Sequence, residues 1–168
     1  MLRNRLIVAV LVLSVATWLL LAVASLNADY KAEVELAPMA SGHAPTYVQF
    51  LSNQGVHLLL YFLPYHSNPL VWAIAVAGFC AQFTPFLAVL VAAHKPVRVL
   101  CVLTAAFMTY VAAEVAFAMP SANRNGCEPC SNVGAFQVLA GIALVVVAGI
   151  SRSVAQARQG SGVPGDGG

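Results

Sequence analysis

The chain has 168 residues, of which 60% are hydrophobic and only 8% are charged. A soluble domain is typically about 25% charged and about 45–50% apolar, so this composition excludes a soluble globular fold for so short a chain. The formal net charge of +2, without a basic run, also excludes the usual pattern of a nucleic-acid-binding protein. We therefore expect the lipid bilayer to be the main partner of the chain.

Four stretches are long and apolar enough to cross a bilayer: residues 6–26, 70–93, 99–119 and 133–150. Each has at least the roughly 18 residues needed to cross about 30 Å of hydrocarbon. In lipid each must be helical, because no water is present to satisfy exposed backbone groups. The step from Thr84 to Pro85 should kink the second span. The predicted fold is all-α, with a membrane domain of four transmembrane helices in a small bundle over residues 1–154 and a disordered tail over 155–168.

The first span has features of a secretory signal peptide. It follows Arg3 and Arg5, and the sequence from Ala22 to Ala24 would serve as a cleavage site. Its apolar run is about 20 residues long, however, whereas a signal peptide has about 7–15. We therefore expect a retained membrane anchor rather than a cleaved leader.

Basic residues orient the predicted spans. Those on the N-terminal side of the membrane are Arg3, Arg5, Lys95, Arg98, Arg152 and Arg158. The opposite side, made of the loops 27–69 and 120–132, has only Lys31 and Arg124. Because cytoplasmic loops carry an excess of Lys and Arg, we expect both termini in the cytoplasm and a multi-pass protein of a plasma or inner membrane.

The first outer loop becomes apolar again between Thr46 and Tyr65. Gly55, His57 and Pro64 make this stretch a poor transmembrane span, while its aromatic residues suit a helix that lies in the membrane interface. We expect this helix to cap the mouth of the bundle. The alternative is a lid or a surface on which a partner docks.

The second outer loop contains the motif Cys127-Glu-Pro-Cys130, the most chemically specific feature of the chain. A helix N-terminus stabilises a thiolate at such a position. Three interpretations remain open: a structural disulfide between Cys127 and Cys130, which we expect; a redox-active pair; or half of a metal site completed by His43, His57 or His66. These histidines stand at no familiar metal-ligand spacing, so we expect neither a metal nor a cofactor.

A four-helix membrane bundle with an outward Cys-x-x-Cys motif resembles two enzyme families, the quinone-coupled disulfide-forming oxidases and the vitamin K epoxide reductases. The resemblance covers the helix count and one dithiol. Both families relay electrons through a second cysteine pair in an outer loop, and the first outer loop here has no cysteine. Cys80 and Cys101 lie inside the second and third spans, too far away to reach the motif. We expect these two to pack as small apolar side chains.

Polar side chains inside the spans are the remaining candidate site residues: Glu114, Gln82 and Gln137. An intramembrane carboxylate is costly and commonly marks a functional site. Glu114 is about one turn from the end of its span, so we expect it to reach the interface or to bond to Gln137. The alternative is proton or cation handling at an outward cavity. For Gln82 and Thr84 we expect hydrogen bonds that join helices.

Small residues share one face on each of the last two spans. They are Ala105, Ala112 and Ala116 on the third, and Gly134, Gly141 and Gly149 on the fourth. Such faces let helix backbones approach closely in a membrane. We expect these faces to pack within the bundle or against another protein.

The chain contains no nucleophile–base pattern, no glycine-rich phosphate loop and no H-E-x-x-H motif. We therefore predict a non-enzymatic accessory, assembly or interaction subunit of a membrane complex, which contacts a protein partner or a second copy of itself. One alternative is a membrane thiol–disulfide oxidoreductase that uses Cys127 and Cys130. Another is a small transporter or metal-handling protein that uses Glu114.

Overall fold

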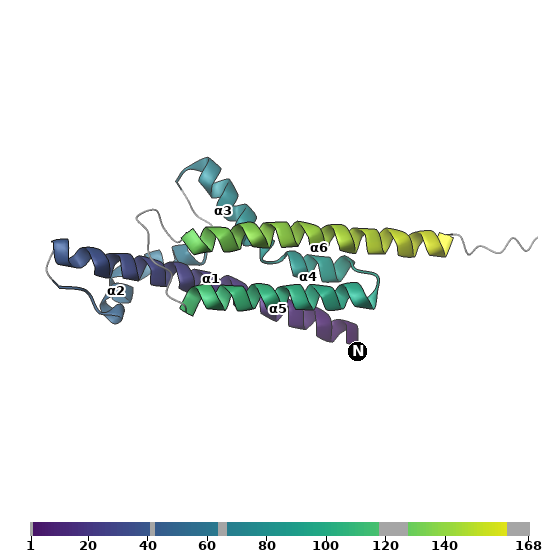
Figure 1. Ribbon diagram of the computed structural model, residues 1–168, viewed down its shortest axis with the longest axis horizontal. Helices are drawn as coiled ribbons and strands as arrows, with labels where there is room; N and C mark the ends of the chain where they lie inside the picture. Colours follow the sequence, from purple (N-terminus) through teal and green to yellow (C-terminus); the bar gives the residue numbers. More distant parts are fainter. Residues whose placement is uncertain (1, 41–42, 64–66, 118–127, 161–168) are drawn as a thin grey trace, which may run out of the picture.

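The computed structural model describes residues 2–40, 43–63, 67–117 and 128–160. These residues form α1 (Leu2–Ala40), α2 (Tyr47–Gln54), the 3-10 helix η1 (Gly55–Tyr61), α3 (Pro69–Ala81), α4 (Thr84–Val91), α5 (Lys95–Phe117) and α6 (Glu128–Gly160). The long helices α1, α5 and α6 run side by side, with α4 between them and α3 standing away from the bundle (Figure 1). The predicted all-α class is confirmed.

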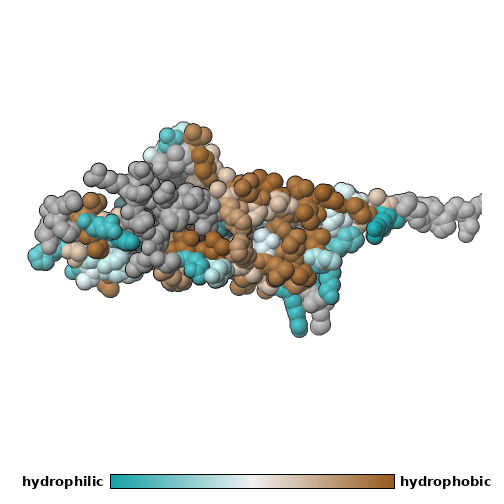
Figure 2. Space-filling model, viewed as in Figure 1, coloured by the Kyte–Doolittle hydropathy of each residue, from teal (hydrophilic) through white to brown (hydrophobic). Residues whose placement is uncertain are grey.

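Three helical segments are long and apolar enough to cross a membrane: Arg3–Ala37, Lys95–Phe117 and Gly134–Gln159. The bent pair of α3 and α4 makes a fourth if it is counted as one span. Hydrophobic residues gather over the part of the bundle where α4, α5 and α6 lie, and hydrophilic residues lie towards its two ends (Figure 2). The chain is therefore a small multi-span membrane protein.

The predicted kink at Thr84-Pro85 is present, because α3 and α4 meet at 48°. Pro85 has no backbone N–H, so the carbonyl of Ala81 loses its helical donor. The Thr84 hydroxyl donates a hydrogen bond of 2.6 Å to this carbonyl. The bend thus satisfies the freed backbone group within the chain, as an apolar surrounding requires.

Small and compact side chains let the helices pack closely. The central cluster consists of Val10, Ala88, Val89, Ala92, Cys101, Ala105, Leu144 and Ala148. Ala105, Ala112 and Ala116 of α5 are buried, as the small-residue pattern predicts. On α6 the tightest contact is at Gly141, where an added Cβ would overlap Thr84 and lie 2.9 Å from its Cβ. Gly134 and Gly149 have no such neighbour.

Hydrogen bonds also join α1 to α5. The hydroxyls of Thr17 and Thr109 lie 2.9 Å apart, and the Thr109 hydroxyl lies 3.1 Å from the carbonyl oxygen of Leu13. Nearer the end of α5, the Asn27 amide donates to the carbonyl of Ala116 at 3.0 Å. These bonds between helices fix the position of α1 along α5.

Helix α1 continues to Ala40, well past the predicted end of the first span. Segments α2 and η1 pack against its last part. The rings of Tyr30 and Tyr47 meet edge to face with centroids 4.8 Å apart, and Phe50 is buried beside them. The Tyr47 hydroxyl donates to the Asn27 side-chain oxygen at 2.8 Å. The predicted helix in the first outer loop is therefore present, and it packs on the side of α1. We call this end of the bundle the α2 end.

Helix α6 is longer than the predicted span 133–150 at both ends. The predicted disordered tail begins at residue 155, but residues 155–160 continue the helix, since Ala, Gln and Arg are good helix formers. Residues 161–168 lie outside the described part of the chain. The start of α1, the turn between α4 and α5 and the end of α6 all lie at one end (Figure 1), which we call the N-terminal end.

Candidate functional site

A crevice of about 370 Å³ lies between α1, α3, α6 and η1. Its lining residues are Trp18, Leu21, Ala22, Ser25, Tyr61, Phe62, Leu63, Ala75, Gly78, Phe79, Gln82, Gly134 and Gln137. The volume falls at the lower end of the range of about 300–1,000 Å³ for ligand pockets. Most of the lining residues are aromatic, aliphatic or small, and those with polar side-chain groups include Ser25, Tyr61, Gln82 and Gln137.

Trp18 of α1 contacts residues on two other walls of the crevice. Its indole Nε1 donates a hydrogen bond of 2.9 Å to the carbonyl of Phe62, which directly follows η1. The indole also meets Phe62 and Phe79 edge to face, with ring centroids 6.0 and 6.2 Å away. Because Phe79 belongs to α3, one side chain of α1 contacts both η1 and α3. Segment η1 thereby closes the α2 end of the crevice.

Helices α1 and α3 are otherwise nearly out of contact. Helix α3 packs mainly against α6, and its bend into α4 directs it away from α1 (Figure 1). Trp18 lies 12 residues after Leu6, which is about 18 Å along a helix at about 1.5 Å per residue. If α1 enters the hydrocarbon near Leu6, the crevice lies in the half of the membrane nearer the α2 end.

Gln82 and Gln137 are the unusual residues of the crevice. Gln137 is 0% exposed and Gln82 is 8% exposed. Neither amide atom of Gln137 has a hydrogen-bond partner, and the side-chain oxygen of Gln82 has none. A buried polar group without a partner costs about 1–3 kcal/mol. The residues that line the crevice thus include two with unpaired, buried amide atoms, and together these amides contain both donors and acceptors.

The prediction that Gln82 bonds to another helix is therefore wrong for its side-chain oxygen, whereas Thr84 forms a bond within its own bend. The amide of Gln82 lies at the end of α3, where the last turn is interrupted before Pro85. From this position it lines the crevice instead of meeting a polar side chain of a neighbouring helix. Gly134 and Gly78, which have no side chain to fill the gap, line the same crevice.

Tyr61 connects η1 to α1 at the rim. Its hydroxyl donates a hydrogen bond of 2.8 Å to Asp29. Burial and, next, this hydrogen bond raise the pKa of Tyr61 above the ordinary tyrosine value. The phenol therefore remains a neutral donor at physiological pH, and the residues that line the crevice include no Asp, Glu, Lys or Arg.

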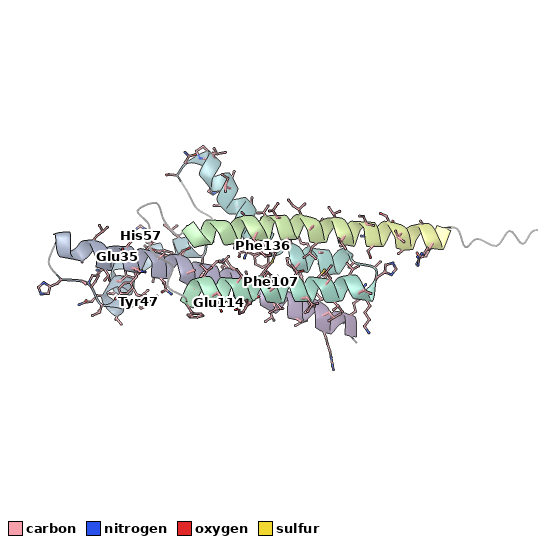
Figure 3. All side chains as sticks on the ribbon, viewed as in Figure 1. Glu35, Tyr47, His57, Phe107, Glu114 and Phe136 are labelled. Atoms are coloured by element: carbon pink, nitrogen blue, oxygen red, sulfur yellow. The ribbon has the colours of Figure 1, made fainter. Side chains whose placement is uncertain are left out.

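The predicted pair of Glu114 and Gln137 is not formed. Glu114 is exposed near the end of α5 (Figure 3), and Tyr110, one turn earlier, hydrogen-bonds to it. Gln137 faces the crevice instead, without a partner. Glu114 does not line the crevice, and its expected position at the membrane interface stays a prediction.

The cysteines divide into two groups. Cys101 is buried in the central cluster, as predicted, whereas Cys80 is a free thiol on the exposed side of α3, so its predicted burial is wrong. Cys127 lies outside the described residues, and Cys130 is in the first turn of α6. The predicted disulfide between them stays a prediction, because the described part of the chain does not include both partners.

The candidate metal ligands do not gather. His43, His57 and His94 are exposed, and His66 lies outside the described residues. Among the residues that the structure describes, no group of three or more His, Cys, Asp or Glu side chains could hold a metal ion. Comparison of the chain with protein families, characterised proteins and solved structures gave no match.

Sequence reasoning missed the aromatic part of the site. Trp18 and Phe79 are ordinary members of apolar spans, and Phe62 belongs to an apolar loop. Their contacts depend on η1 folding back over α1, which no local pattern predicts. The sequence did single out Gln82 and Gln137 as amides in otherwise apolar helices, but as residues that bond between helices and not as crevice residues.

Proposed function

We propose that the chain is a non-enzymatic accessory, assembly or interaction subunit of a membrane complex, and that α3 is its main contact element. The observation that carries this proposal is the position of α3, which packs mainly against α6 and leaves the crevice between itself and α1. In a membrane, helices associate through close packing and hydrogen bonds between helices. A helix that uses one side for its own bundle has the remaining sides for a partner.

One exposed side of α3 has residues that suit such a contact. Leu70 and Ile74 lie four residues apart on this side and are exposed, and Trp72 is exposed on the other side of the helix. Large aromatic side chains are enriched where proteins bind one another. We propose that a transmembrane helix of another protein, or α3 of a second copy, lies against this side.

We further propose that the N-terminal end of the bundle is cytoplasmic. The starts of α1 and α5 and the last part of α6 carry the basic residues Arg3, Arg5, Lys95, Arg98, Arg152 and Arg158. The α2 end carries the acidic residues Asp29, Glu33 and Glu35. This distribution fits the excess of Lys and Arg on cytoplasmic sides of membranes. The membrane would be a plasma or inner membrane.

Site-specific photocrosslinking in native membranes tests the proposed contact. A photoreactive residue replaces Ile74 on α3, which is 63% exposed, or Leu103 on α5, which is 61% exposed and serves as the matched control. We expect one discrete protein adduct from position 74 and none from position 103. Lipid adducts alone at both positions, or equal protein adducts at both, would contradict the proposal. Coexpression of two differently tagged copies distinguishes a second copy from another protein.

The two alternative functions have less support from the described residues. The thiol–disulfide oxidoreductase depends on Cys127 and Cys130, and only the second belongs to a described helix. The transporter depends on Glu114, which is exposed and does not line the crevice. Alkylation of Cys127 and Cys130 against a graded redox buffer tests the first. A potential of about −120 to −270 mV is typical of catalytic dithiols, and one below about −300 mV of structural disulfides.

A further inference from the structure

We propose that the crevice binds a neutral lipid that carries a free hydroxyl group, with Gln82 and Gln137 as its hydrogen-bond partners. This site goes beyond the proposed protein contact and needs no partner protein. The crevice belongs to one chain, since α1, α3, α6 and η1 enclose it. Its test therefore uses the purified chain alone and succeeds or fails independently of photocrosslinking on α3.

The chemistry of the two amides selects the ligand. The free oxygen of Gln82 can only accept a hydrogen bond, so the ligand must supply a donor. Gln137 has a free oxygen and a free NH₂ group, so it requires both a donor and an acceptor. A hydroxyl group donates and accepts, and an adjacent ester carbonyl accepts. A molecule with carbonyl groups alone would leave both amide oxygens without partners.

The lack of charged residues in the described lining disfavours ionic headgroups. No described lining residue is acidic or basic, and Tyr61 at the rim donates its hydrogen bond to Asp29. Among the described residues that line the crevice, a buried phosphate headgroup would find no cation, and burying an unpaired charge is very costly. The site therefore fits a neutral headgroup. Diacylglycerol is the simplest bilayer lipid that has this combination of a hydroxyl group and ester carbonyls.

The walls of the crevice suit the rest of such a molecule. Trp18, Phe62 and Phe79 form an aromatic wall, and about 370 Å³ accommodates a headgroup with the first carbons of its chains. Because α1 and α3 are nearly out of contact, the acyl chains can extend between them into the bilayer. Tyr61, Phe62 and Leu63 line the crevice at its α2 end, and the proposed route of entry for the ligand is from the membrane.

Fluorescence of Trp18 provides the readout. The chain has two tryptophans, so a Trp72→Phe background leaves only the one that lines the crevice. The full chain in lipid nanodiscs is titrated with 1,2-dioctanoylglycerol, with its 3-O-acetyl derivative, which lacks the hydroxyl group, and with dioctanoyl phosphatidylglycerol. We expect a saturable change with the first probe and at least about tenfold weaker binding of the other two, since an interaction of about 1.4 kcal/mol changes affinity tenfold.

Amide variants connect the signal to the site. Gln137→Leu and, separately, Gln82→Leu should each weaken dioctanoylglycerol binding about tenfold. Gln156→Leu makes the same chemical change at an exposed position of α6 and should leave binding unchanged. If one crevice variant fails to fold, the other still decides the question. Equal binding of the acetylated probe, equal binding of phosphatidylglycerol, no saturable change, or full binding by both amide variants would each overturn the proposal.

Discussion

The indole Nε1 of Trp18 and the carbonyl oxygen of Phe62 are joined by a hydrogen bond of 2.9 Å, although 44 residues separate them in sequence. This bond connects a transmembrane helix to the segment that covers the crevice. A 3-10 helix of seven residues is longer than usual, and Gly55, with φ of +50°, starts it in a conformation that other residues rarely adopt. Segment η1 therefore depends on contacts with α1 to keep its position.

Trp18→Phe should release this segment. The substitution keeps an aromatic ring in the crevice but removes the donor to Phe62, and a typical hydrogen bond contributes about 0.5–1.5 kcal/mol. We expect faster amide hydrogen exchange in residues 55–63 and a loss of about 1 kcal/mol of stability. Trp72→Phe, which changes an exposed ring on α3, is the control and should alter neither. Unchanged exchange in the Trp18 variant would mean that η1 is held by other contacts.

Gly141→Ala should separate α6 from α4. The added Cβ would overlap Thr84 at the bend, and overpacking of this kind costs about 1–3 kcal/mol. Gly149→Ala, on the same helix, meets no atom within 4 Å and should be neutral or slightly stabilising. Unfolding in mixed micelles measures both. A Gly141 variant as stable as its Gly149 counterpart would show that the two helices do not approach closely at Thr84.

The Tyr61–Asp29 bond predicts a pH dependence. Burial and, next, Asp29 raise the pKa of Tyr61 above its ordinary value of about 10. The folded state favours the protonated phenol, so this contribution to stability is fully present below pH of about 10 and is lost only as the pH rises through the raised pKa. In Asp29→Asn the pKa of Tyr61 should move back towards 10.

Tyrosinate absorbance during an alkaline titration follows this ionisation, and subtraction of the Tyr61→Phe titration isolates one of five tyrosines. The wild-type residue should ionise above the ordinary tyrosine pKa of about 10. If Tyr61 ionises near pH 10 in the wild type, the hydrogen bond to Asp29 does not form in solution. If Asp29→Asn leaves the pKa unchanged, burial alone accounts for the shift.

The fold could be predicted largely from the sequence because its information is local. The length of the apolar stretches predicted the spans, and the missing backbone N–H of Pro85 predicted the bend. Small residues on α5 gave its buried face, since Ala105, Ala112 and Ala116 are buried. The ends of α1 and α6 were misplaced because both helices continue past their apolar parts into polar sequence. Hydropathy marks where the membrane ends but not where a helix ends.

The site could be predicted only in part. Gln82 and Gln137 stand out in the sequence because amide side chains are uncommon in apolar spans. Their position inside the predicted spans suggested hydrogen bonds between helices. Which partner each amide meets depends on how helices rotate and bend. The bend before Pro85 directs Gln82 to the crevice, and Gln137 faces the same space from α6. Glu114, the most conspicuous polar residue in sequence, lies outside it.

The amide of Gln137 has no hydrogen-bond partner among the described residues, and the stability of ligand-free Gln137→Leu measures whether one forms in solution. Leucine is of similar size and removes a buried polar group that is not hydrogen-bonded, so we expect unchanged or higher stability, by up to about 1–3 kcal/mol. The measurement is reversible unfolding of the delipidated chain in mixed micelles, with Gln156→Leu as the control. A loss of about 1 kcal/mol or more, on the order of one broken hydrogen bond, would contradict the unpaired state of the Gln137 amide and show that Gln137 joins helices rather than serving a ligand.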